Sequence, residues 1–128
     1  MEKVTQLSVA LENVPGQLGR MCRVLAQAGV NIRGISISDA ADISTIRLCV
    51  SDPAAAKRAL REVGLPFVTQ EVVMVEVPDK PGALEDVAVR LGEASVNINY
   101  VYSAGGEGGK AVLVLGVDDV DVARQTLR

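Results

Sequence analysis

The sequence has little of the residue types on which most enzymes depend. It contains no histidine and no tryptophan, and aromatic residues make up 2% of its 128 residues. The absence of histidine removes the commonest general base and the commonest transition-metal ligand of proteins. No nucleophile–base pair and no cluster of metal-ligating residues stands out either. We therefore expect no catalytic site, no metal and no other cofactor.

Positive charge and long apolar runs are scarce as well. The formal net charge is −3, and the longest cluster of basic residues is Lys57-Arg58. A protein that binds a polyanion normally carries a basic stripe, so nucleic acids and anionic membranes are poor partners. The longest apolar runs, residues 72–75 and 111–115, fall far short of the roughly 20 residues that a spanning helix needs.

The amino terminus, Met1-Glu2-Lys3, leads directly into a strand pattern and has none of the shape of a signal peptide. This favours a cytoplasmic location. Cys22 and Cys49 are far apart in the sequence, and without a signal peptide such residues are commonly small buried hydrophobes, although a pairing stays open.

The residues that are abundant repeat in order. Hydrophobic residues make up 48% of the chain, enough for an aliphatic core. A series of identical residues recurs with a spacing of 66: Pro15-Gly16 and Pro81-Gly82, Leu18 and Leu84, Leu25 and Leu91, Ala28 and Ala94, Val30-Asn31-Ile32 and Val96-Asn97-Ile98, Asp52 and Asp118. The repeat predicts two equivalent domains, residues 1–70 and 71–128.

Each repeat predicts the same succession of elements. Alternating apolar residues predict a first strand, and apolar residues at helical spacing after the Pro-Gly turn predict a helix. Two further strands and a second helix follow; the expected ranges are 7–11, 18–28, 30–38, 43–50 and 52–63, and then 73–77, 84–94, 96–103, 110–117 and 118–128. Residues 65–70 predict a fourth strand that runs without a linker into the second repeat. The second repeat lacks a counterpart, so either a partner supplies that strand or the edge is exposed.

This order predicts an α+β fold made of two ferredoxin-like βαββαβ units in tandem, the second without its last strand. Several functions of such units are disfavoured by what is missing. The third strands carry no aromatic residues on which RNA bases could stack. The loops after the first strands contain neither the thiols of a copper carrier nor the arginine of an acyl-phosphate hydrolase.

The remaining motifs resemble the ACT domain, a small regulatory module that senses amino acids. They are a Pro-Gly-x-Leu turn after the first strand and Val-Asn-Ile, with its Asn 15 residues after the glycine, in both repeats. The resemblance covers essentially the whole chain and extends to stand-alone tandem-ACT proteins. It implies a non-catalytic regulator that binds a free amino acid.

The Pro-Gly turn can serve this purpose because it begins a helix. Free backbone N–H groups and the positive helix end suit a carboxylate, and glycine allows a close approach. In ACT domains the ligand typically sits between one module's turn and the second strand of its neighbour. The implied ligand-binding residues are Asn13, Val14, Pro15, Gly16, Gln17, Leu18, Asn31 and Ile32, and Asp79, Lys80, Pro81, Gly82, Ala83, Leu84, Asn97 and Ile98. The plainer alternatives are a simple helix-start turn and asparagines that only satisfy backbone groups.

The resemblance also bears on the ligand and on partners. Serine-sensing ACT modules carry a polar residue two positions before the turn asparagine, where this chain has Leu11 and Val77. An aliphatic or aromatic amino acid is therefore favoured. Both faces of residues 111–117 are apolar, which favours a homodimer or a partner interface. The alternative function is that of a regulatory small subunit of an amino-acid biosynthetic enzyme, such as acetolactate synthase.

Overall fold

The computed structural model describes all residues, 1–128, and contains six strands and four helices. The elements are β1 (Glu2–Glu12), α1 (Gln17–Gln27), β2 (Ile32–Ser38), β3 (Ile43–Val50), α2 (Pro53–Glu62), β4 (Phe67–Pro78), α3 (Ala83–Glu93), β5 (Ile98–Ser103), β6 (Lys110–Val117) and α4 (Val120–Thr126). The predicted α+β class and the order of elements are confirmed. No helix is long and apolar enough to cross a bilayer.

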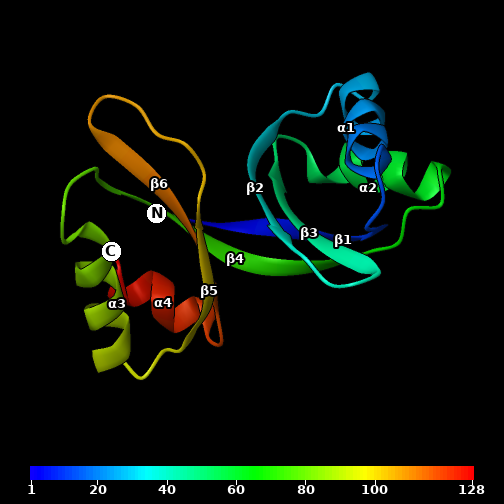
Figure 1. Cartoon of the computed structure of the whole chain (residues 1–128). Coiled ribbons are helices and arrows are strands. Elements are labelled where there is room, and N and C mark those ends of the chain that lie inside the picture. Colours follow the sequence, from blue (N-terminus) through cyan, green and yellow to red (C-terminus); the bar gives the residue numbers. More distant parts are fainter. The chain divides into compact units, whose positions relative to one another are not determined.

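The first compact unit comprises Thr5–Gln70. Its antiparallel strands run in the order β2-β3-β1, with the first residues of β4 beside β1, where the Ala10 N–H donates to Pro66 O at 3.0 Å. Helices α1 and α2 cover one face of this sheet (Figure 1). The core between them is aliphatic and consists of Leu7, Val9, Leu11, Met21, Leu25, Val30, Ile46, Leu48, Val50, Ala56, Leu60 and Leu65.

The second compact unit comprises Glu71–Arg128 together with Met1–Val4. Its strand order is β1-β4-β6-β5, so the amino-terminal residues lie beside β4 at the position of the fourth strand. An ion pair of 3.3 Å joins Lys3 Nζ to Glu71 Oε2. The edge that the repeat leaves without a strand is therefore occupied by residues of the same chain, in place of the partner strand or exposed edge expected.

The helix boundaries follow local chemistry. The Asp52 side chain caps α2 by accepting from the Ala55 N–H at 3.1 Å, and Pro53 follows at the first helical position, as predicted. Gly29 (φ +73°) and Ser95 (φ +59°) occupy equivalent left-handed positions after α1 and α3. Serine adopts this conformation at a cost that glycine avoids.

The repeat spacing changes within the hairpins. The cap of α4 is Asp119, whose carboxylate accepts from the Val122 N–H at 3.1 Å, whereas the repeat pairs Asp52 with Asp118. The loop 105–109 contains one residue more than the loop 39–42, so the spacing is 67 beyond it. Asp118 instead matches Ser51: each accepts from the backbone N–H of the asparagine that precedes the second strand, Asn97 or Asn31.

The predicted apolar faces of the helices are confirmed except at their first turns. Met21 and Leu25 in α1 and their counterparts Val87 and Leu91 in α3 are buried. Leu18 and Leu84 are 40% and 44% exposed. Each is the second residue of its helix, in the turn that projects beyond the sheet, so neither joins the core. Cys49 is buried, Cys22 is half-buried, and both are free thiols.

Candidate functional site

Each candidate site begins at a glycine in a left-handed conformation. Gly16 (φ +91°, ψ −16°) precedes α1, and Gly82 (φ +89°, ψ −6°) precedes α3. Neither helix start has a side-chain cap. The first turns therefore leave backbone N–H groups without an acceptor: those of Leu18 and Gly19 in α1, and those of Leu84 and Glu85 in α3. Unpaired donors at a helix start suit a carboxylate.

A cavity of about 280 Å³ lies beside the first turn. Its walls come from the end of β1, the first turn of α1, the start of β3 and the connection from α2 to β4: Ala10, Leu11, Glu12, Gln17, Arg20, Ile43, Gly64, Leu65 and Pro66. Glu12 and Arg20 are its charged residues. One Nη2 hydrogen of Arg20 is donated to Val63 O at 3.3 Å, which fixes the guanidinium beside the Gly64 wall.

A second cavity, of about 360 Å³, lies beside the second turn. It is lined by Val77, Pro78, Lys80, Pro81, Gly82, Ala83 and Asp86. Asp86 also lies 3.7 Å from Arg90 Nη1 through its Oδ2. Like the first cavity, this one presents one basic and one acidic side chain, Lys80 and Asp86.

The two turn residues differ in how they hold the neighbouring hairpin. In the first unit the Asn13 N–H donates to Asp42 O at 2.8 Å, and its side-chain Nδ2 donates to Ala40 O at 3.2 Å. In the second unit the Asp79 N–H donates to Gly109 O at 2.9 Å, but its carboxylate has no hydrogen to donate. Asn13 therefore fixes its hairpin loop twice and Asp79 once.

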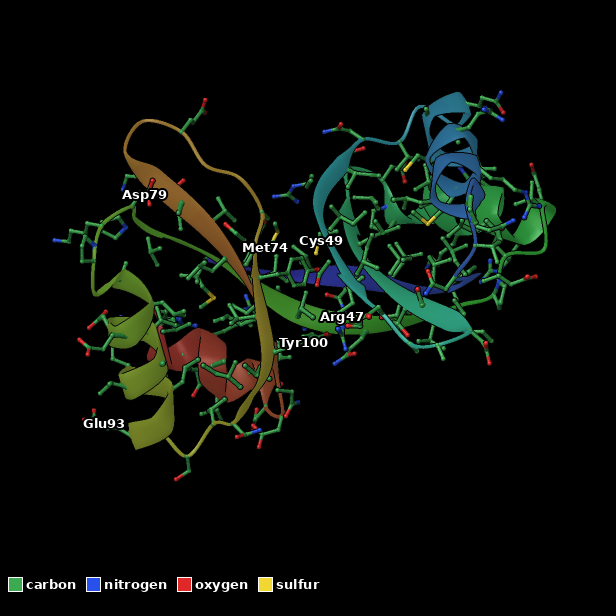
Figure 2. All side chains as sticks on the ribbon, viewed as in Figure 1. Arg47, Cys49, Met74, Asp79, Glu93 and Tyr100 are labelled. Carbon is green, nitrogen blue, oxygen red and sulfur yellow. The ribbon has the colours of Figure 1, made fainter.

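The predicted asparagines of the second strands lie at the other end of their own units. The Asn31 N–H donates to Ser51 Oγ at 2.9 Å, beyond the end of β3, whereas Asn13 bonds to Asp42, before its start. The length of β3 separates them by roughly 25–30 Å. Figure 2 shows the same separation in the second unit, with Asp79 near the start of α3 and Glu93 at its far end. A single unit does not bring the two groups of predicted residues together.

The cavities contain some of the predicted residues and several others. Gln17 lines the first cavity, and Lys80, Pro81, Gly82 and Ala83 line the second. The other predicted residues line neither cavity: Asn13, Val14, Pro15, Gly16, Leu18, Asn31, Ile32, Asp79, Leu84, Asn97 and Ile98. Ile32 and Ile98 instead pack half-buried against the two cores.

The charged residues of the cavities were not predicted from the sequence, apart from Lys80. Glu12 ends β1, and Arg20 lies one helical turn beyond Gly16. A residue at that distance from the capping glycine faces the same end of the helix, so helical spacing from Gly16 could have indicated Arg20 and its counterpart Asp86. No group of three or more His, Cys, Asp or Glu side chains could hold a metal ion.

Comparisons with known proteins give a consistent family. The family model of the ACT domain pair matches residues 2–127. The crystal structure of protein BT0572 from Bacteroides thetaiotaomicron is 33% identical over 98% of this chain and 86% of that one, with a TM-score of 0.92. The regulatory subunit of aspartate kinase from Thermus thermophilus (97% and 87% covered, TM-score 0.75) and that from Thermus flavus (99% and 91%, TM-score 0.64) are each 14% identical and share the fold. No curated protein matches the chain.

Proposed function

The chain belongs to the ACT domain family as an ACT domain pair, and from that premise we propose that it is a non-catalytic regulator that binds a free amino acid at its β–α turns. ACT domains are regulatory modules, and the family match over residues 2–127 indicates no catalytic domain. The proposal concerns the class of ligand and its place.

The observation that carries the proposal is the pair of charged cavities at equivalent turns. A free α-amino acid bears a carboxylate and an ammonium group, and each cavity offers a cation and an anion: Arg20 and Glu12 in the first, Lys80 and Asp86 in the second. An arginine can bind a carboxylate through two parallel hydrogen bonds. Volumes of about 280 and 360 Å³ lie at or below the low end of the roughly 300–1,000 Å³ typical of drug-sized ligands, which suits a small molecule.

The apolar walls support an aliphatic or aromatic amino acid. Leu11, Ile43 and Leu65 line the first cavity, and Val77 lines the second. None of these side chains can hydrogen-bond the hydroxyl of a serine. An apolar side chain would gain about 25 cal/mol for each Å² that it buries against them. Exposed Val14 and Leu18 continue the apolar surface from the first cavity onto the turn.

Asn31 and Asn97 enter the proposal through a second copy of the chain. Because each lies at the far end of its own unit from the turn, it can reach a ligand at such a turn only from a different module. We expect a homodimer, acting in the cytoplasm, in which the asparagine of one copy meets a ligand on its partner. The ligand would regulate by favouring the arrangement to which it binds more tightly.

The test is calorimetric titration of the whole chain with each of the twenty amino acids at millimolar concentration. The proposal predicts saturable heat with aliphatic or aromatic amino acids, and a ligand that binds only the folded state raises the melting temperature. Arg20→Gln should weaken that binding, whereas the exposed Arg23→Gln on the same helix should not. Titrations without heat or thermal stabilisation for all twenty would refute the proposal.

A second candidate is a regulatory subunit of an amino-acid biosynthetic enzyme, of which acetolactate synthase is one example. It is favoured by the occurrence of this fold as separate regulatory chains, since the chain covers 87% of the aspartate kinase regulatory subunit from Thermus thermophilus. This candidate predicts that a tagged chain retains a larger catalytic protein during purification. Recovery of the tagged chain only with itself would favour the stand-alone regulator.

A further inference from the structure

The two turn cavities are built on the same structural positions. Four pairs of lining residues are each separated by 66 residues: Leu11 and Val77, Glu12 and Pro78, Gln17 and Ala83, and Arg20 and Asp86. The cavities can therefore be compared position by position. At the last pair the charge is reversed, because the first cavity has a helix-borne cation where the second has a helix-borne anion.

We infer that the two sites are unequal: the first cavity binds the carboxylate of the amino acid and the second does not, so that each chain binds one amino acid. This inference rests on the proposed function and adds which repeat is occupied. It follows from Arg20, Asp86 and the charges around each helix start.

The helix start of the first site favours an anion in every respect. The first turn of α1 contains no acidic residue, so the positive end of the helix and the Leu18 and Gly19 N–H groups are not neutralised. Arg20 contributes a full positive charge. Only one of the five guanidinium hydrogens is committed, to Val63 O, and the others can bind a carboxylate. Glu12, across the cavity, is placed to accept from the ammonium group.

The helix start of the second site is already neutralised. Glu85 and Asp86 occupy the first turn of α3, where their carboxylates interact favourably with the positive helix end. A ligand carboxylate would compete with both and be repelled by both. Lys80 offers one compensating cation from the turn, but Asp79 beside it adds another acid. Arg90 is 3.7 Å from Asp86 on the side of the next helical turn and does not line the cavity.

The test exchanges the two charges in the whole chain. Each of the twenty amino acids is titrated at millimolar concentration into the wild type, Arg20→Asp and Asp86→Arg, with Arg23→Asp as the matched control on α1. The inference predicts one site per chain in the wild type and in Arg23→Asp. Affinity should fall by about tenfold or more in Arg20→Asp, because a charge-assisted hydrogen bond is lost. Asp86→Arg should gain a second site.

The outcomes separate this inference from the proposed function. Two equivalent sites in the wild type, or unchanged affinity in Arg20→Asp, overturn the inference and leave amino-acid binding intact. No binding by any of the twenty refutes the proposed function and the inference with it. Arg20 and Asp86 are both exposed, and melting curves confirm that the variants fold. If Arg20→Asp fails to fold, Arg20→Gln removes the cation without adding an acid and gives the same comparison.

Discussion

Replacing the turn glycines by alanine should destabilise the protein, although there is space for the new methyl group. A Cβ added to Gly16 or Gly82 would meet no heavy atom within 4 Å, so no clash opposes it. The cost lies in the backbone, since φ values of +91° and +89° lie in a region that costs an L-residue roughly 1–2 kcal/mol. Alanine also reduces the freedom of the unfolded chain by about 0.4–1 kcal/mol. The net destabilisation expected for each variant is about 1 kcal/mol.

Two glycines within the helices provide the matched comparison. Gly19 in α1 and Gly92 in α3 likewise have open space where a Cβ would lie, but neither has a positive φ. The same substitution there should stabilise the protein by about 0.5–1 kcal/mol, because alanine is the better helix former. Gly16→Ala and Gly19→Ala, three residues apart, should therefore differ by about 1.5–2 kcal/mol with opposite signs.

Urea unfolding followed by circular dichroism measures these differences directly. A change of 1 kcal/mol corresponds to roughly 3–4 °C in melting temperature for a chain of this size, which thermal scans also resolve. The reasoning is refuted if Gly16→Ala is neutral or stabilising, since the left-handed conformation would then not be required at the turn. Equal changes for Gly16→Ala and Gly19→Ala would refute it as well.

Three further predictions follow from the fold. Ser95→Gly should stabilise the protein by about 0.5–1 kcal/mol in urea unfolding and Gly29→Ser should destabilise it similarly, because both positions are left-handed; an opposite order would contradict this. Asp52→Ala and Asp119→Ala should each cost about 1 kcal/mol through loss of a helix cap, and unchanged urea midpoints would argue against capping. Removal of Met1–Val4 should speed amide hydrogen exchange in β4 of the second unit, since a neighbouring strand is lost; unchanged exchange would show that the edge needs no partner.

Most of the fold could be predicted because the chain contains its pattern twice. The third strands, residues 43–50 and 110–117, have the predicted bounds, and β4 continues from the first repeat into the second without a linker. What the repeat could not indicate was the position of Met1–Val4 in the second unit. That placement joins residues at opposite ends of a repeat, and no local periodicity carries it. The extra residue in the loop 105–109 is similarly hidden, because it shifts the register only beyond the hairpin.

The candidate site was predictable only where it is continuous in sequence. The Pro-Gly turns marked both helix starts, and Lys80 and Ala83 were placed correctly beside the second one. The first cavity takes walls from a strand end, a helix turn, a hairpin and the connection after α2, so residues such as Arg20 and Leu65 meet only in three dimensions. The resemblance to the family named the turn and the strand-two asparagines, but not Arg20 and Asp86, which make the two cavities differ.

The most direct test of amino-acid binding at the helix starts is a two-dimensional amide NMR titration of the whole chain with each amino acid. A carboxylate held at the first turn should shift the amide signals of Leu18 and Gly19 most strongly, because their N–H groups have no acceptor within the protein. The matching signals of Leu84 and Glu85 should move less. Largest shifts far from both turns, or no shifts with any amino acid, would contradict the account.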